Sequence, residues 1–372
     1  MVQLDLSEDQ VLLHDTTVRF IEAELPIGQT RLLHDDPNGY DRGWLQKAAG
    51  LGWFAMLVPE ADGGGCMSGD GLADAAIIAE ELGRHLQPGP FVPMNVVAAA
   101  VAAHGSAAAR ADLLPELVAG ETVATWALSA MDGSVDDGAG VGFDGSALTG
   151  SRGYVQDVAS ADVMLVSAER DGEPVQVLVP TAADGIELVP LDSLDRSRRF
   201  AHVHLDRVQV DADAVLGGGA AGLEAALLTA VVLNLADTVG AIDRLFEMTV
   251  AYAKDRVAFG RPIGSFQAIK HILADQALYL ETCRAGAAAA AKAVSAGDER
   301  ASEVVSMTAA YIGDVANDIA QECLQVHGGI GYTWEHDLHL FLRRVRSNAA
   351  VYGEPSWHRE RVCTWYGLGE ER

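Results

Sequence analysis

The chain has 372 residues and 49% of them are hydrophobic, so it can form more than one structural region with a large core, and disorder is not expected. Its formal net charge of −27 at pH 7 argues against binding to nucleic acid or to anionic membranes, because both require a basic surface. The start MVQLDLSEDQ lacks the features of a signal peptide and no apolar stretch looks long enough to span a bilayer, so we expect a cytoplasmic protein without membrane insertion.

The first part of the chain has the apolar spacing of helices. Ser7 is a candidate N-cap for a helix that continues through Glu24, and another helix is expected over GLADAAIIAEELGRHL. A glycine-rich loop, PEADGGGCMSGDG, precedes that second helix. We therefore predict an N-terminal helical domain over residues 1–118.

The next part, residues 119–216, changes to a period of two. Short segments such as ADVMLVSAE, PVQVLVPT and AHVHLDRVQV have the pattern of strands, and Gly, Asp and Ser turns separate them. Short strands at this regular spacing predict an antiparallel β-sandwich or barrel as the middle domain.

The last part, residues 217–372, returns to the helical period. Long helices are predicted over residues 220–256, 266–296 and 301–326. Helices this long and apolar pack together, so a C-terminal four-helix bundle is expected. The predicted fold class is therefore multidomain α+β, in the order helices, sheet, helices.

No metal site is predicted. The cysteines are widely scattered and no pair has metal-ligand spacing, so reduced and mostly buried thiols are expected at Cys66, Cys283, Cys323 and Cys363. The spacing of His336 and His339 permits metal binding, but no third ligand is evident.

The segment DRVAFGRPIGSFQAIKH, residues 255–271, joins two of the long helices through a turn. Gly260 and Gly264 permit a tight backbone there, and Pro262 prevents the helix from continuing. Arg256 and Arg261 add forked cationic donors, which suit a diphosphate attached to an aromatic ring system. An ordinary helix–helix connection is the alternative interpretation.

The segment QVHGGIGYTWEHDLHLFLRR, residues 325–344, follows a predicted helix. Its cluster His327, Gly328, Gly329 and Gly331 ends that helix and lets the backbone approach a ligand closely. The pattern differs from the dinucleotide fingerprint GxGxxG, which follows a strand.

Together these segments resemble the FAD-binding signatures of the acyl-CoA dehydrogenase family, RxxFGxPIxxFQ followed by QxxGGxGY. GWLQKAAGLGWFAMLVPEADGGG and EELGRHLQPGPFVP resemble the family's early helices, and LDSLDRSRRFAHVHLDRVQV resembles the end of its middle domain. The resemblance covers nearly the whole chain. Within the family, the chain is similar to bacterial, notably actinobacterial, paralogues. It implies a dimer or tetramer, homo- or hetero-oligomeric, that binds FAD, oxidises an acyl-CoA to a trans-2-enoyl-CoA, and reduces an electron-transfer flavoprotein or similar acceptor.

The resemblance also implies particular FAD contacts. Positions that meet the diphosphate and adenine side of a neighbouring subunit's FAD correspond to Arg256, Phe259 and Gln267, and the second segment corresponds to Gln325, Gly328 and Gly329. In the middle domain the family's ALTEPxxGSD and WITN correspond to ALSAMDGS and YVQD, which implies contacts at Leu128, Ser129, Ser134, Tyr154 and Gln156. Ordinary strand residues are the alternative interpretation for Ser134 and Gln156.

Dehydrogenation requires a carboxylate base, because the α-proton of a thioester is only weakly acidic and needs a base in a dry pocket. The two positions where the family keeps that base correspond to Gly353 and Ala230, and neither is a carboxylate. Glu354 lies one residue later and is the candidate base, since Pro355 restricts it to an extended backbone that could redirect its side chain. A solvated glutamate in a turn is the alternative.

The expected function is the first of three that remain open on this evidence. The first is an FAD-dependent acyl-CoA dehydrogenase of lipid metabolism, such as fatty acid β-oxidation, that uses Glu354. The second is a non-catalytic or half-site subunit of a heteromeric acyl-CoA dehydrogenase, as in steroid side-chain degradation, whose sister chain supplies the base. The third is other flavin chemistry that needs no base. Small residues at Ala230, Ala236 and Gly240 indicate either room for a bulky acyl group or close helix packing.

Overall fold

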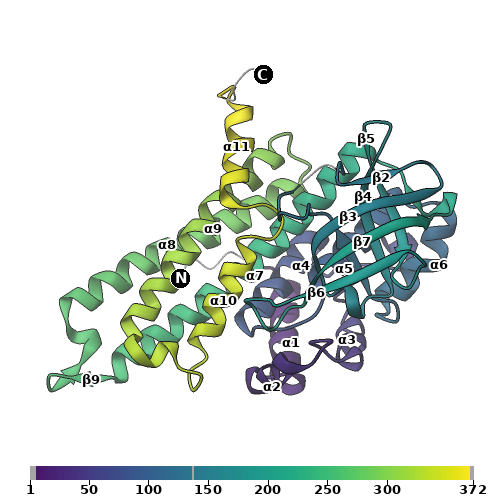
Figure 1. The fold of residues 1–372 in the computed structure, drawn as a ribbon. Coiled ribbons are helices and arrows are strands. Elements are labelled where there is room, and N and C mark those ends of the chain that lie inside the picture. The colour runs from purple at the N-terminus through teal and green to yellow at the C-terminus, as the bar shows by residue number, and fades with distance from the viewer. Residues whose placement is uncertain (1–5, 136–137, 369–372) are drawn as a thin grey trace. The chain divides into compact units, whose positions relative to one another are not determined.

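The computed structural model describes residues 6–135 and 138–368 (Figure 1). The chain forms two compact units. One unit comprises the chain up to Ile27, Ala76–Gln87 and the chain from Val232 onward, and we call it the helical unit. The other comprises Gly28–Ala75 and Pro88–Val231 and contains the main sheet, so we call it the sheet unit.

The N-terminal part of the chain is helical, as predicted. Ser7 caps the first helix with a complete capping box, in which its hydroxyl accepts from the Gln10 N–H and the Gln10 side chain accepts from the Ser7 N–H. The elements are α1 (Glu8–Glu24), α2 (Ile27–Leu32), η1 (Leu33–Asp35), α3 (Arg42–Ala49), η2 (Glu60–Asp62), α4 (Gly71–Arg84), α5 (Phe91–His104) and α6 (Ala107–Val118). The glycine-rich loop before α4 is held by the buried Asp74 carboxylate, which accepts from the N–H groups of Met67 and Ser68 at 2.8 Å each.

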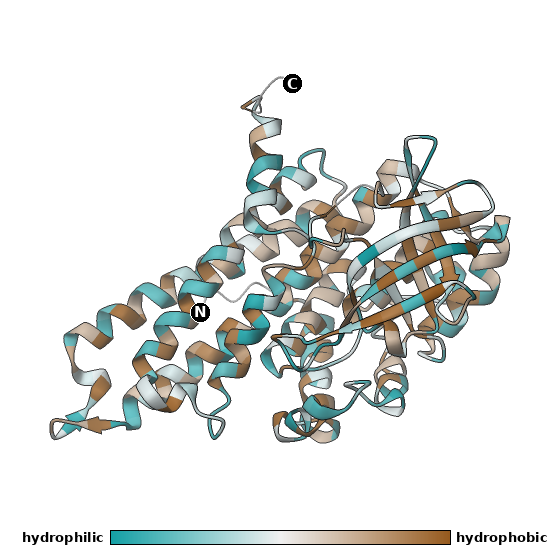
Figure 2. Cartoon of the chain, in the orientation of Figure 1, coloured by the Kyte–Doolittle hydropathy of each residue, from teal (hydrophilic) through white to brown (hydrophobic). Residues whose placement is uncertain are grey.

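The middle part of the chain forms one sheet with the order β6-β7-β3-β2-β4-β5-β8, and β1 pairs with β4. Its strands are β1 (Ala124–Ala127), β2 (Val141–Phe143), β3 (Ala147–Gln156), β4 (Val163–Arg170), β5 (Glu173–Pro180), β6 (Ile186–Leu191), β7 (Phe200–Gln209) and β8 (Val215–Leu216). Most pairings are antiparallel, as predicted, but β1 and β2 both pair with β4 in parallel. Hydrophobic and hydrophilic residues alternate along strands such as β7 (Figure 2), and the apolar faces form a buried core.

The last part of the chain is helical, so the predicted order of helices, sheet and helices is confirmed. The elements are α7 (Gly219–Asp255), β9 (Val257–Ala258), β10 (Arg261–Pro262), η5 (Ile263–Ser265), α8 (Gln267–Ser295), α9 (Ala301–His327), η6 (Gly328–Tyr332), α10 (Leu338–Asn348) and α11 (Pro355–Trp365). The expectation that no apolar stretch is long enough to span a bilayer was wrong for helix α7, which has the length and hydropathy to cross one. However, 83% of its most apolar window is buried inside the protein, so it is a core helix. The domain limits at residues 118 and 216 remain a prediction, since the two compact units group the chain differently.

Helices α4 and α7 pack backbone to backbone in the helical unit. A Cβ added at Gly240 would lie 1.8 Å from the Glu80 carbonyl oxygen, and one added at Gly83 would lie 1.8 Å from the Asp237 carbonyl oxygen. Both glycines are therefore required by the helix contact. Of the two explanations offered for small residues on α7, close packing accounts for Gly240.

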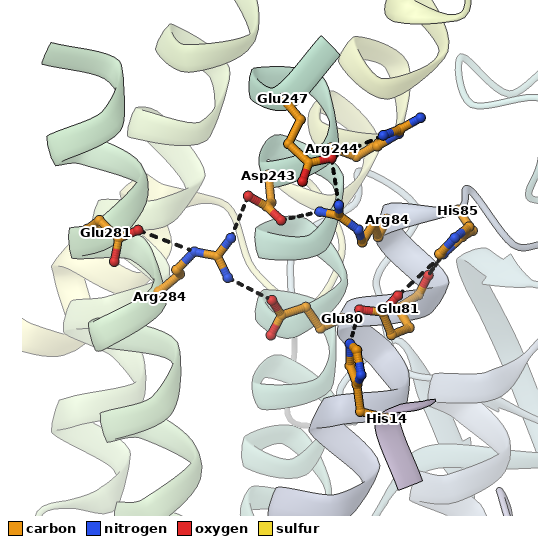
Figure 3. A network of polar contacts seen from close by, with 10 residues as sticks. All are labelled: His14, Glu80, Glu81, Arg84, His85, Asp243, Arg244, Glu247, Glu281 and Arg284. Carbon is orange, nitrogen blue, oxygen red and sulfur yellow. Dashed lines mark hydrogen bonds and ion pairs between the residues drawn. The ribbon is translucent and has the colours of Figure 1, made fainter. Parts of the chain in front are cut away.

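A network of charged side chains connects four helices of the helical unit (Figure 3). Arg284 on α8 reaches Asp243 on α7 at 2.5 Å and Glu80 on α4 at 3.1 Å. Arg84 on α4 pairs with the same Asp243, and Glu81 accepts from His14 on α1. The network fixes the register of α1, α4, α7 and α8 through partly buried ion pairs.

Candidate functional site

The segment after α7 forms a short hairpin that presents an aromatic side chain to solvent. Strands β9 and β10 pair antiparallel, and the turn residues Phe259 and Gly260 both have positive φ, at 53° and 79°. Two consecutive positive φ values are typical of a type I′ hairpin turn. This turn directs Phe259 outward, and its side chain is 96% exposed. The hairpin therefore presents the Phe259 ring where a ligand or another chain could contact it.

The guanidinium group of Arg256 makes no hydrogen bond or ion pair with any described residue. Arg256 follows the last residue of α7 and is exposed. Arg261 differs, because its guanidinium lies 4.1 Å from the centre of the Phe266 ring. Gln267 begins α8 and is also exposed. The hairpin therefore offers the donors of Arg256 and Gln267 for an incoming anion.

The second predicted segment lies at the end of α9. Gly328 ends the helix with a φ of 63°, and Cβ atoms added at Gly328 or Gly329 would meet nothing within 4 Å. Gln325 is exposed on the last turn of the helix. Open space beside two glycines and an exposed amide permits a ligand to approach the backbone closely.

The two segments are brought to the same end of the helical unit. Tyr252, one turn before Arg256, stacks on the ring of His327 with 4.4 Å between ring centres and 19° between ring planes. The Nδ1 atom of His327 lies 2.9 Å from the Cys323 carbonyl oxygen and donates to it, and burial lowers the pKa of His327. The sequence placed His327 in the cluster that ends this helix but did not indicate Tyr252 as its partner, because their contact joins residues far apart in the chain.

These residues fit the diphosphate and adenine side of FAD. The fit rests on the uncommitted guanidinium of Arg256, the exposed ring of Phe259, and the open space beside Gly328 and Gly329. In the part of the chain that the structure describes, no group of three His, Cys, Asp or Glu side chains could hold a metal ion.

The candidate contacts of the middle domain gather at one place in the sheet unit. The Gly153 N–H donates to the Ser129 carbonyl oxygen at 2.9 Å, which joins the segment after β1 to β3. Tyr154 sits at an irregularity in β3 with a φ of 52° and is 46% exposed. A Cβ added at Gly133 would lie 3.4 Å from the Tyr154 ring, so the turn residues pack against that ring. The bulge therefore turns an aromatic side chain outward.

The other middle-domain candidates are engaged within the protein. Leu128 is buried, so only its backbone is placed to meet a ligand. The hydroxyl of Ser134 donates to Asp132 at 2.6 Å. The amide nitrogen of Gln156 donates to the Gly89 carbonyl oxygen at 3.2 Å and to Asp157 at 2.9 Å, and these two bonds use both of its N–H groups. Gln156 can thus contact a flavin through its amide oxygen or after releasing one partner.

Asp157 was not singled out in the sequence. It is buried, and burial raises the pKa of its carboxyl group to about 6. The sequence shows Asp157 at the end of the YVQD segment, but its burial and its positive φ of 51° are visible only in the structure. Asp157 fixes the orientation of Gln156.

Neither expected base position carries a carboxylate. Ala230 is fully buried within α7, and Gly353 is buried with a φ of 109°. Glu354 has the extended backbone that Pro355 predicts, with φ −68° and ψ 157°, and is the N-cap residue of α11. Its side chain is exposed, and no described residue hydrogen-bonds to its carboxylate. An exposed carboxylate is not in the dry pocket that a base for the α-proton of a thioester requires.

The turn that contains Gly353 follows a helix anchored deep in the helical unit. The guanidinium of Arg344 on α10 is fully buried, donating to Asp237 and to the Gln87 carbonyl oxygen at 2.9 Å each. Asn348, at the end of α10, donates to Asp237 at 2.7 Å and to Thr238 at 2.9 Å. The turn therefore begins from a rigid and internally satisfied platform.

Comparison with protein families matches both ends of the chain. Residues 217–366 match the C-terminal domain of acyl-CoA dehydrogenases, and residues 7–121 match the N-terminal domain. The acyl-CoA dehydrogenase IpdE2 of Mycolicibacterium smegmatis is 31% identical over 351 residues, which are 94% of this chain and 96% of that protein. IpdE2 of Mycobacterium tuberculosis is also 31% identical, over 349 residues, which are 94% of each chain.

Solved structures share the fold across nearly all of the chain. A variant of the Tcur3481–Tcur3483 steroid ACAD has a TM-score of 0.88 and 27% identity, covering 97% of this chain and 98% of that one. The ChsE4–ChsE5 complex from Mycobacterium tuberculosis has a TM-score of 0.88 and 25% identity, covering 98% of this chain and 99% of that one.

Proposed function

The chain belongs to the acyl-CoA dehydrogenase family, and from that premise we propose that it is a subunit of a heteromeric acyl-CoA dehydrogenase that helps to hold FAD but supplies no catalytic base. The observation that carries this proposal is the turn at Gly353. The residue at the family's base position is a buried glycine with a positive φ, and the neighbouring Glu354 is exposed. A base for the α-proton of a thioester must be a desolvated carboxylate, and this turn does not provide one.

The retained part of the function is cofactor binding. The guanidinium of Arg256 would hold the diphosphate of a neighbouring subunit's FAD, Phe259 would pack against the adenine side of that FAD, and Gly328 and Gly329 would let the backbone approach it. When bound, FAD accepts the hydride that leaves the β-carbon of the acyl chain. On the sheet, the backbone of Leu128 and Ser129 and the side chains of Ser134, Tyr154 and Gln156 would border the flavin. Tyr154 supports this role best, because the irregularity in β3 turns its ring outward.

The missing part of the function would come from a sister chain with the same fold. This assignment is supported by the two-component names of two solved relatives, the Tcur3481–Tcur3483 steroid ACAD and the ChsE4–ChsE5 complex. We propose an acyl-CoA substrate, with steroid-derived acyl groups to be tested first and fatty acyl groups second. We further propose a dimer or tetramer in the cytoplasm that passes electrons to an electron-transfer flavoprotein or a similar acceptor.

The second candidate is a self-sufficient dehydrogenase in which Glu354 is the base. One observation favours it: the Glu354 carboxylate lies one residue from the family position, on an extended backbone, and is not held by another described side chain. Movement of that turn over a bound substrate would be required to desolvate the carboxylate.

The two candidates differ in the expected effect of Glu354→Gln. The chain is purified alone and after co-expression with sister chains of the family, and the flavin absorbance is followed anaerobically after addition of steroid-derived and fatty acyl-CoAs. For a half-site subunit, the wild-type chain alone does not bleach, and in the complex Glu354→Gln changes the bleaching rate by less than about twofold. Loss of a general base costs about 10²- to 10⁴-fold in rate, so a loss of that size would establish Glu354 as the base. Glu360→Gln is the matched control, because Glu360 is exposed on the same helix.

A further inference from the structure

The space beside residue 353 is occupied by side chains of the chain's own last helix. A Cβ added at Gly353 would lie 2.6 Å from Cε3 of Trp357 and 2.9 Å from Nε2 of His358. His358 is only 3% exposed, and its ring packs edge-on against the Trp357 ring with 4.9 Å between centres. Two rings from the first turn of α11 therefore occupy the space that the Cβ of any side chain at position 353 would need.

We propose that Trp357 and His358 form a plug that closes the base position of this subunit, so that the half-site is shut to a base as well as lacking one. The significance of position 353 rests on the proposed function, whereas the plug itself rests on the contacts around Gly353. If the plug is correct, a carboxylate installed at position 353 alone does not create a working base, because its Cβ cannot be placed without displacing the two rings.

The plug is held in place by contacts of α11 with α9. Pro355 is the first residue of α11, and its Cγ would lie 2.6 Å from a Cβ at Gly313, so α11 sits directly against the α9 backbone. The His358 N–H donates to the Glu354 carbonyl oxygen at 3.1 Å, which places His358 in the first helical turn. These contacts fix the first turn of α11, which carries both rings, against α9.

The Trp357 ring also contacts an arginine of its own helix. The guanidinium of Arg361 lies 4.8 Å from the centre of the Trp357 ring and 2.9 Å from the Ser302 hydroxyl on α9. Arg359, on the same helix, also pairs with Asp314 on α9 at 2.6 Å. Both arginines hold α11 against α9, so displacement of Trp357 would break a cation–π contact as well as packing.

Two separate effects oppose a side chain at position 353, and they can be measured separately. The backbone φ of 109° is unfavourable for any L-residue and does not depend on Trp357. The steric contact with the indole ring does depend on Trp357. A pair of substitutions therefore distinguishes the plug from a glycine that is required only by the backbone.

The test is a thermal double-mutant cycle on the full chain, using Gly353→Ala, Trp357→Ala and the double variant. The plug predicts that Gly353→Ala lowers Tm by about 4 °C or more in the wild-type background and by less than half as much in the Trp357→Ala background. An equal loss in both backgrounds, or failure of Gly353→Ala to fold in both, would overturn the plug, because removing the indole then relieves nothing. Gly28→Ala in α2 is the matched control and should not lower Tm, since its Cβ would meet nothing within 4 Å.

A second measurement uses the flavin-loaded complex in which the sister chain's base has been removed. Gly353→Glu is introduced into this chain, and the flavin absorbance is followed after addition of the acyl-CoA that the intact complex oxidises. The plug predicts no bleaching, and bleaching by this single variant would overturn it. This outcome is distinct from failure of the proposed function, which would appear as bleaching by the wild-type chain alone.

Discussion

Two regions of the helical unit differ in what their polar groups contact. We call the region of Arg256, Phe259 and Gln325 the flavin end, and the region of Arg344, Asn348 and Gly353 the base end. At the flavin end, Arg256, Phe259 and Gln325 are exposed, and the donors of Arg256 are not used by any described residue. At the base end, the Arg344 guanidinium and the Asn348 amide are buried and donate to Asp237. One end is arranged to receive a group from outside, and the other end is already satisfied by the chain itself.

This difference agrees with the proposed half-site subunit. A binding surface needs donors that folding leaves unused, because donors that are already bonded must break a contact before they bind a ligand. The flavin end has such donors. The base end has a buried glycine at position 353 and two rings, Trp357 and His358, beside it. The contrast between the two ends is what the proposed function requires, in which this subunit would bind the cofactor and another chain would abstract the proton.

The largest expected effect is the loss of the buried ion pair at the base end. Arg344→Met leaves the Asp237 carboxylate without its main partner in a buried position, which costs about 3–5 kcal/mol in the free energy of unfolding. Urea unfolding followed by circular dichroism measures this loss. Arg346→Met on the same helix is the control and should change the free energy by less than about 0.5 kcal/mol, because Arg346 is exposed. Equal losses in the two variants would mean that the buried Arg344–Asp237 pair contributes no more to stability than an exposed arginine does.

The next effect concerns the flavin end. Arg256→Ala removes the guanidinium proposed to hold the diphosphate, and FAD affinity should fall about 10- to 100-fold, which corresponds to about 1.4–2.8 kcal/mol. The Tm of the flavin-free protein should stay unchanged, since no described residue depends on this side chain. Flavin fluorescence on titration measures the affinity, with Arg359→Ala as the control for loss of an exposed arginine. A large fall in the Tm of flavin-free Arg256→Ala would mean that the Arg256 side chain already has partners within the chain, so the two ends would not differ in this respect.

The sequence predicted the elements of both ends but not their difference. The long helices over residues 220–256, 266–296 and 301–326 correspond to α7, α8 and α9 within a residue or two at each end, because an apolar stripe with helical period determines them locally. The motif residues at the flavin end could also be recognised, since they lie within two short segments.

The state of the base end could not be read from the sequence. Whether Gly353 leaves an open pocket depends on Trp357 and His358, and the position of those rings depends on how α11 packs on α9. Such contacts follow from tertiary packing rather than from a local pattern. The same reason explains why the two parallel pairings with β4 were missed, since alternation predicts a strand but not its neighbours.

In the sheet unit, a smaller effect on stability is expected from the buried Asp157. Burial raises the pKa of Asp157 from 3.8 to about 6, so the folded state retains this proton over a range in which the unfolded state has lost it. The free energy of unfolding should therefore fall as pH rises from about 4 to 6 and stay flat above that range. Asp157→Asn removes this cost and should be about 1–2 kcal/mol more stable than wild type at pH 7, with no gain at pH 4.

Urea unfolding at both pH values measures the Asp157 effect, and the flavin spectrum adds a second readout. If Gln156 borders the flavin, Asp157→Asn should shift the visible absorption bands, because the Gln156 amide donates to Asp157. A variant with Asp184→Asn serves as control, since that carboxylate is exposed and no described residue pairs with it. A gain in stability that is equal at pH 4 and pH 7 would contradict the predicted titration.

The smallest effect is expected in the charged network near the middle of α7, between the two ends. The Nε2 atom of His14 lies 3.2 Å from the Glu81 carboxylate, whose hydrogen bond raises the pKa of His14 to about 9 (Figure 3). A raised pKa means that this contribution is fully present below the unfolded value of 6.5 and is lost as pH rises to 9. Because the His14 side chain is 40% exposed, solvent screening reduces the contribution to about 1 kcal/mol. The wild-type urea midpoint should fall between pH 6.5 and 9.5 by more than that of His14→Gln, whereas His271→Gln, at an exposed position on α8, should keep the wild-type dependence. Identical pH profiles for wild type and His14→Gln would show that the His14–Glu81 pair contributes no measurable stability. The polar contacts of the helical unit that matter would then be those at its two ends.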